Sequence, residues 1–178
     1  VQDEALEVLQ RFRVRYTPWE DGLNVASAPE LVGKLVAGAA DAGVRFFNGV
    51  FVEDVMLVGG KVRGVVVNWG AVEAAGLHVD PLAIESRAVL DATGHDAEVV
   101  RALARKAKVE LEVPGERPMW AEEGEKAVVA ETKEVYPGLW VAGMAANAVS
   151  GSPRMGPIFG GMLLSGKRAA ELIKASLK

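Results

Sequence analysis

The stretch SRAVLDATGHDAEVVRALARK, residues 86–106, decides the fold class. Its first six residues form a short apolar run that predicts a buried strand ending at Asp91. The polar run 92–96 follows, and the apolar spacing from about Ala97 to Lys106 predicts a helix. A strand followed directly by a helix is the repeating unit of α/β proteins with parallel sheets, so the sequence predicts that class.

Helical spacing predicts two further helices towards the N-terminus. The first covers residues 3–12, and the second runs from Ser27 to about Ala42 and stops at Gly43. Ser27 and Glu30 have the spacing of a capping box, in which the serine and the glutamate each bond the other's backbone N–H. We therefore expect Ser27 to cap the second helix.

From Val44 to Trp69 the sequence has the period of strands and is rich in valine and phenylalanine. Gly59 and Gly60 separate VEDVMLV from KVRGVVV, which is the pattern of a hairpin with a two-residue turn. By analogy at the level of the fold, such a hairpin is typical of insertions in two-domain dinucleotide-binding proteins.

The C-terminal half adds a predicted short helix over 119–130, a short buried strand over 139–142 and an amphipathic helix within 156–178. A turn at Pro137–Gly138 precedes the strand. This alternation of strands and helices favours an α/β layer with a mostly parallel sheet.

The composition favours a folded chain. Apolar residues make up 50% and charged residues 25%, which suffices for a hydrophobic core. No apolar stretch approaches the ~20 residues of a membrane-spanning helix, and the first residues do not have the pattern of a signal peptide. The net charge of −4, without a basic block, argues against nucleic-acid binding. We expect a cytoplasmic protein with no membrane or nucleic-acid partner.

Two histidines next to aspartates are candidates for a metal site, because the chain has no cysteine. His78 and Asp80 lie two residues apart and share a side if that segment is extended. His95 and Asp96 follow the predicted strand, where α/β proteins place ligands. Imidazole and carboxylate suit Fe(II), Mn(II) or Zn(II). A local reading remains open, in which His78 packs nearby and Asp96 caps the following helix.

Two other segments are candidates for ligand binding. Residues 150–157 lead into the last helix, where free N–H groups and Arg154 could bind a carboxylate or pyrophosphate. The glycines Gly156, Gly160 and Gly161 would let a ligand or another backbone come close. A solvated surface loop is the alternative. Residues 51–54 could pair with an adenine edge, or they form a plain hairpin strand.

One motif of dinucleotide-binding domains does not occur. Such a domain normally opens with a strand, a G-x-G-x-x-G turn and a helix, with an acidic residue about 20 positions later. Residues 156–161, GPIFGG, resemble the turn loosely but follow no strand directly. A dinucleotide-binding protein with this sequence would be represented by its C-terminal two-thirds.

Three runs together resemble the thiamine thiazole synthase family over nearly the whole chain: NWGAVEAAGLHVDP (68–81), DATGHDAEV (91–99) and LWVAGMAANAVSGSPRMGPIFGGMLLSG (139–166). The resemblance implies a dinucleotide-binding fold of the glutathione-reductase type, with a Rossmann-like layer and a hairpin-containing insertion. It also implies ring-shaped homo-oligomers, commonly octamers.

By this resemblance the N-terminal βαβ portion of the fold is absent. Residues 1–178 then form a single incomplete domain. The insertion region lies in 1–85, and the C-terminal part of the dinucleotide-binding layer lies in 86–178. We expect the chain on its own to be inactive.

The resemblance further implies an enzyme of transferase type that uses NAD as a substrate. Nicotinamide is released, glycine condenses with the ADP-ribose portion, and sulfur enters to give an adenylated thiazole carboxylate. Asp80 and His95 match the Fe(II) ligands, and Arg154 matches the residue that binds the glycine carboxylate. His78, Asp80 and His95 would be catalytic. The positions that match the lining of the NAD-derived ligand are Val52, His78, Val79, Asp80 and Met144.

His78 assigns the chain to one branch of that family. In fungal and plant relatives a cysteine at this position donates its own sulfur once. Here the residue is histidine and the chain has no cysteine, so the resemblance is to the archaeal branch, which uses free sulfide. Two other functions stay open: an FAD-dependent oxidoreductase of the same superfamily, and a non-catalytic subunit that needs a partner chain with the nucleotide-binding half.

Overall fold

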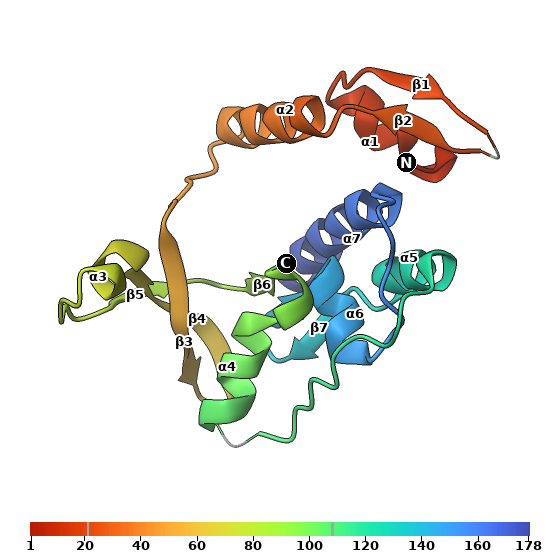
Figure 1. The fold of residues 1–178 in the computed structure, drawn as a ribbon. Coiled ribbons are helices and arrows are strands. Elements are labelled where there is room, and N and C mark those ends of the chain that lie inside the picture. The colour runs from red at the N-terminus through yellow and green to blue at the C-terminus, as the bar shows by residue number, and fades with distance from the viewer. Residues whose placement is uncertain (21, 108) are drawn as a thin grey trace.

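The computed structural model describes residues 1–20, 22–107 and 109–178 (Figure 1). The helices are η1 (Asp3–Ala5), α1 (Leu6–Arg11), α2 (Ala28–Asp41), α3 (Gly70–Ala74), η2 (Gly94–Asp96), α4 (Glu98–Ala107), α5 (Ala121–Ala130), α6 (Met144–Ser150) and α7 (Gly160–Ser176). The strands are β1 (Tyr16–Pro18), β2 (Asn24–Ala26), β3 (Val50–Val58), β4 (Lys61–Trp69), β5 (Leu82–Glu85), β6 (Val89–Asp91), β7 (Lys133–Tyr136) and β8 (Leu139–Val141). The α/β class is therefore confirmed.

The sheets differ from the expected arrangement. Only β6 and β8 pair in parallel among the described strands, while the pairs β1–β2, β3–β4, β4–β5 and β7–β8 are antiparallel. The prediction of a mostly parallel sheet is thus wrong for the described residues. Tight turns return β3 onto β4 and β7 onto β8, whereas β6 and β8 are separated by α4 and α5, a crossover long enough for parallel pairing.

The predicted hairpin is confirmed. β3 and β4 pair through their whole length, and the turn between them consists of Gly59 and Gly60 with φ of 60° and 73°. Both values are positive, as a type I′ turn requires. The predicted strand period begins too early, because the first paired residue is Val50 rather than Val44.

The predicted capping of α2 by Ser27 is confirmed, but the reciprocal bond to the Glu30 carboxylate is replaced by other contacts. The N–H of Glu30 donates to Ser27 Oγ at 3.5 Å. The Glu30 carboxylate instead accepts from Lys34 Nζ at 2.6 Å and from Arg15 N at 3.2 Å. These bonds, the one from Lys34 first, lower the pKa of Glu30 to about 2. Glu30 therefore joins α2 to the segment before β1 rather than closing a capping box.

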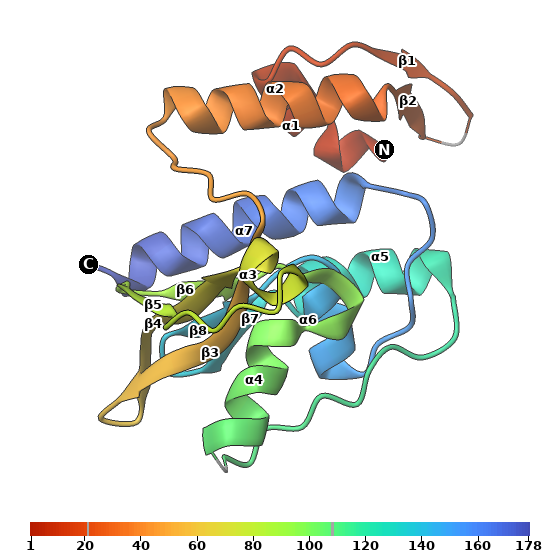
Figure 2. The ribbon, with the colours of Figure 1, turned by 60° about the vertical axis from the view of Figure 1, so that its left-hand side comes forward.

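The core lies where β3 and β4 meet the C-terminal half of the chain. The buried residues of this cluster are Val55, Val62, Ala97, Val99, Val100, Leu103, Leu139, Val141, Ala145, Ala146 and Ala148. Helix α7 packs on α5 and β8 on one side and on η1 and α1 on the other, so it lies between the N-terminal helices and the β6–β8–β7 sheet (Figure 2). The predicted strand 86–91 is shorter than expected and less buried, since Leu90 is 39% exposed.

Within the described ranges, no helix combines the length and the hydropathy needed to cross a bilayer.

Candidate functional site

The loop after β6 is fixed by Asp91, the last residue of the strand. Its side chain is fully buried; Oδ1 accepts the N–H and the hydroxyl of Thr93 at 2.9 and 2.7 Å. Thr93 Oγ1 in turn accepts the N–H of Glu98 at 2.8 Å, and Asp91 Oδ2 accepts the N–H of Val100 at 3.0 Å. The capping role that the local reading gave to Asp96 therefore belongs to Asp91 and Thr93. These bonds hold the short turn η2, which carries His95.

His95 contacts a carboxylate that is distant in sequence. Its Nδ1 forms a hydrogen bond with Glu116 Oε2. The side chain of His95 is 46% exposed, whereas that of Glu116 is only 9% exposed. The ring therefore has one nitrogen engaged by a buried carboxylate and an open face towards solvent.

A cavity of about 420 Å³ brings His95 and Arg154 together. It is lined by His95, Met119, Met144, Arg154, Met155, Gly156, Pro157, Phe159 and Met162. Three of the residues predicted from the sequence, His95, Met144 and Arg154, thus lie around one space. Four of the five methionines of the chain also line it, and these flexible thioethers give walls that adapt to the shape of a ligand.

Arg154 is exposed, but the backbone around it is held firmly. Its N–H donates to Arg117 O at 3.0 Å, and its carbonyl accepts the N–H of Trp120 at 3.1 Å. The fully buried Asn147 donates its amide to Pro153 O at 3.2 Å and to Gly124 O at 3.0 Å. An exposed guanidinium on an anchored backbone is suited to bind a carboxylate or a phosphate.

The segment 77–81 lies elsewhere. It connects α3 to β5 and is exposed, and Figure 1 shows this connection on the far side of β3 and β4 from α6 and α7. Asn68 Nδ2 donates to Val79 O at 3.4 Å. Within one chain, His78, Val79 and Asp80 do not line the cavity at His95.

Val52 also lies outside that cavity lining. It sits in β3, partly buried against the main core. No group of three or more histidine, aspartate and glutamate side chains that could hold a metal occurs within residues 1–20, 22–107 and 109–178.

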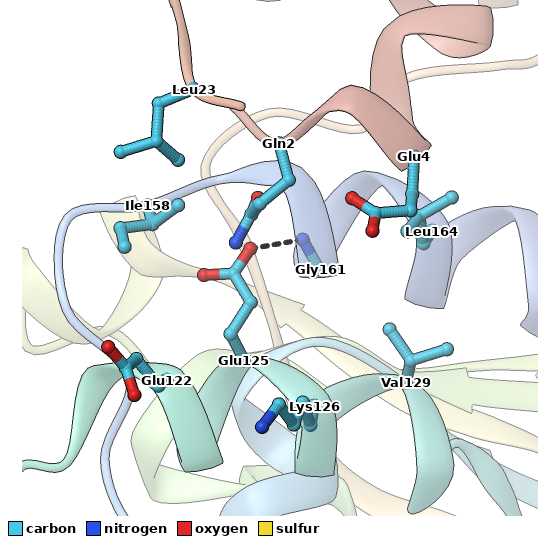
Figure 3. Close-up of a pocket in the computed structure, with 10 residues that line it drawn as sticks. All are labelled: Gln2, Glu4, Leu23, Glu122, Glu125, Lys126, Val129, Ile158, Gly161 and Leu164. Atoms are coloured by element: carbon cyan, nitrogen blue, oxygen red, sulfur yellow. Dashed lines mark hydrogen bonds between the residues drawn. The ribbon is translucent and has the colours of Figure 1, made fainter. Parts of the chain in front are cut away.

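The start of α7 does not offer all of its N–H groups to a ligand. Figure 3 shows Glu125 reaching from α5 to Gly161, whose N–H donates to Glu125 Oε1 at 2.5 Å. A Cβ on Gly161 would come within 2.7 Å of the Glu125 carbonyl. Gly161 therefore permits the close approach of α5. The expectation that the N–H groups at the start of α7 are free to bind an anion is wrong for the N–H of Gly161, because it is bonded to Glu125.

Sequence reasoning missed Glu116 and three of the methionines that line the cavity. Glu116 lies in a polar loop between Gly115 and Pro118, a region that carries no periodicity and matches no motif. Its partner His95 is 21 residues away, so only the folded chain reveals the contact.

Comparison with known proteins gives consistent matches. A model of the Thi4 family matches residues 1–159. The chain is similar to thiamine thiazole synthases of Methanothermobacter thermautotrophicus (52% identity over 183 residues, 100% of this chain and 71% of that protein) and Methanococcoides burtonii (57% over 178 residues, 97% and 69%). A crystal structure of Thermovibrio ammonificans THI4 superposes with a TM-score of 0.95 at 51% identity, covering 99% of this chain and 70% of that one.

Proposed function

The chain belongs to the Thi4 family, whose curated relatives are thiamine thiazole synthases, and we propose on this premise that it converts NAD, glycine and free sulfide into an adenylated thiazole carboxylate with release of nicotinamide. The observation that carries the proposal is the cavity at the end of β6, which His95 and Arg154 line together. We propose the glutathione-reductase-type arrangement for the fold, with the β3–β4 hairpin as part of the insertion.

Arg154 binds the carboxylate of glycine in this proposal. Its planar guanidinium can donate two parallel hydrogen bonds to a carboxylate, which fixes the orientation of the amino acid as well as its position. The flexible methionine side chains adapt the walls of the cavity to the shape of the substrate. Met144 then contacts the NAD-derived part of the substrate from the same cavity. Val52 and the segment 78–80 do not line that cavity within one chain, so in this proposal they contact the substrate from the insertion of a second copy.

Fe(II) is the proposed metal, with His95 and Asp80 as its protein ligands. His95 suits this role because a carboxylate already engages its Nδ1, as is usual for histidines that bind metals. When bound, the iron supplies open coordination positions for sulfide. His78 has no sulfur to give, so sulfur comes from outside the protein, and imidazole can instead hold or move a proton close to the substrate.

Asp80 and His95 come from different regions of the fold, so we propose that they meet between two copies of the chain in a homo-oligomer. A variant lacking Asp80 still provides His95, and a variant lacking His95 still provides Asp80. Mixing Asp80→Ala and His95→Ala subunits should therefore restore part of the iron content that each variant lacks alone. If the mixture binds no more iron than either variant, the shared site is wrong.

The function is tested by identifying the small molecule that the protein carries. The protein is purified and denatured without oxygen, and the released molecule is analysed by mass spectrometry. We expect an adenylated thiazole carboxylate or an ADP-linked precursor of it. A bound flavin would overturn the proposal in favour of an oxidoreductase.

The role of His95 as an iron ligand is tested by the iron content of two variants. His95→Gln should lose iron. Asp96→Asn, next to His95 in the same turn, serves as the matched control and should retain it.

A further inference from the structure

The hydrogen bond between His95 and Glu116 joins two loops that the chain separates by 21 residues. The imidazole comes from the turn η2 after β6, and the carboxylate comes from the loop between α4 and α5. The Glu116 side chain is 9% exposed, and its second oxygen, Oε1, is buried without a hydrogen-bond partner among the described residues. Burying a carboxylate with one unpaired oxygen costs free energy. This cost indicates that the contact between Glu116 and His95 serves a function.

The backbone holds Glu116 from both sides. Just before it, the N–H of Gly115 donates to Ala148 O at 3.0 Å. Just after it, Arg117 donates its N–H to Ser152 O and accepts the N–H of Arg154, both at 3.0 Å. The carboxylate is therefore attached to a short segment that is anchored along α6 and along the loop that carries Arg154.

This anchoring fixes the ring of His95. A carboxylate next to Nδ1 favours the tautomer in which Nδ1 carries the proton and donates it to the carboxylate. The lone pair of the neutral ring is then on Nε2, and the ring cannot rotate without breaking the bond. Because the same segment bonds to the backbone of Arg154, the orientation of the imidazole and the position of the guanidinium are linked through one piece of backbone.

We infer that Glu116 is a positioning residue, which holds the proton of His95 on Nδ1 and presents Nε2 to the cavity as the ligand atom. The inference rests on the proposed function for the identity of the metal that Nε2 binds, Fe(II). The position of the proton can be measured without any metal, so the two proposals can fail separately.

The first measurement locates the proton on the ring. Long-range ¹H–¹⁵N spectra of the metal-free protein are recorded at a pH well above about 6.5, where a free imidazole titrates. The chain has only two histidines, so His78→Gln assigns the signals. We expect the proton of His95 on Nδ1 in the parent protein and in Glu116→Gln, whose amide oxygen also accepts a hydrogen bond, but not in Glu116→Ala.

The matched control is Glu112→Gln, the same chemical change on an exposed residue of the same loop, and it should leave the tautomer unchanged. A parent ring with its proton on Nε2 would overturn the inference. A Glu116→Ala ring that keeps its proton on Nδ1 would overturn it as well.

The second measurement is the affinity for Co(II), followed by its visible absorption as a substitute for Fe(II). Glu116→Ala should weaken cobalt binding by about 10- to 100-fold, the usual effect of losing the partner of a metal-binding histidine. Glu112→Gln should bind as the parent does, and Glu116→Gln should bind more tightly than Glu116→Ala. Equal affinity of Glu116→Ala and the parent contradicts the positioning role. A parent protein that binds no cobalt contradicts the metal proposal, while the tautomer still decides the role of Glu116.

Discussion

The carboxylate of Asp91 accepts the N–H of Val100 at 3.0 Å, which joins the last residue of β6 to the first turn of α4. The other oxygen of the same carboxylate holds Thr93. One fully buried side chain thus defines the path of the loop between the strand and the helix, and His95 lies within that loop.

Replacing Asp91 by alanine should destabilise the protein and disturb the site. The change leaves the N–H groups of Thr93 and Val100 without their acceptor, and an unsatisfied buried donor costs about 1–3 kcal/mol. We expect the free energy of unfolding in urea to fall by at least about 2 kcal/mol. Asp96→Ala, an exposed aspartate of the same loop, should change it little. Equal losses in the two variants would contradict the anchoring role of Asp91.

Gly124→Ala should move the loop that carries Arg154. A Cβ at Gly124 would lie 2.7 Å from both Met155 N and Pro153 O, which are backbone atoms that cannot rotate away. We expect a loss of at least about 1 kcal/mol in the free energy of unfolding, because overpacking costs more than the helix propensity that alanine gains.

The matched control is Gly33→Ala, because a Cβ at Gly33 in helix α2 meets nothing within 4 Å. Only the helix propensity changes at this position, so we expect the free energy of unfolding to rise by about 1 kcal/mol. Thermal unfolding of both variants checks the pair: the midpoint should fall for Gly124→Ala and rise for Gly33→Ala. A rise in both would show that α5 and the loop separate at little cost.

Elements defined by nearby residues could be predicted from the sequence. Ser27 marks the start of α2, and Gly59–Gly60 marks the turn of the hairpin, because a cap or a turn depends on a few adjacent residues. The direction of strand pairing could not be predicted in the same way. It depends on which strands meet after folding, so the sheet around β8 combines one parallel and one antiparallel neighbour.

The same distinction applies to the site. His95 could be predicted because it follows a predicted strand and stands beside Asp96, and Arg154 because it stands in a glycine- and proline-rich loop before a predicted helix. Their shared cavity depends on the packing of distant segments, and so does the contact of His95 with Glu116. The local sequence also could not show that the Gly161 N–H is taken by Glu125, since that carboxylate comes from α5, 36 residues earlier.

Stability should depend on Glu30 in a pH-dependent way. Its hydrogen bonds with Lys34 and with the N–H of Arg15 lower its pKa in the folded protein to about 2, whereas an unfolded glutamate titrates at about 4.3. The carboxylate therefore stabilises the folded state fully at a pH above about 4.3. This stabilisation is lost as the pH falls towards the folded pKa of about 2.

Glu30→Gln removes that contribution. At neutral pH the variant should unfold at a lower urea concentration than the parent, and the difference should shrink as the pH approaches the folded pKa. Glu110→Gln, on an exposed loop residue, should show no such dependence. A difference between Glu30→Gln and the parent that stays constant across this acidic range would show that the carboxylate is not specifically stabilised by its partners.

The last prediction concerns the specificity of Arg154 for a carboxylate. If its guanidinium donates two hydrogen bonds to glycine, Arg154→Ala should weaken glycine binding by about 10- to 100-fold, since hydrogen bonds to charged groups contribute about 1.5–3 kcal/mol. Arg154→Lys should recover only part of the loss, because an ammonium does not match both oxygens at once. Calorimetric titration of the protein with glycine measures these affinities.

Two controls separate recognition of the carboxylate from a general effect of charge. Arg117 is bonded to the backbone of Arg154, but its side chain lines a different cavity, so Arg117→Lys should bind glycine as the parent does. Glycinamide, which lacks the carboxylate, should bind the parent and Arg154→Ala equally. If glycinamide loses as much affinity as glycine in Arg154→Ala, the arginine shapes the cavity and does not contact the carboxylate.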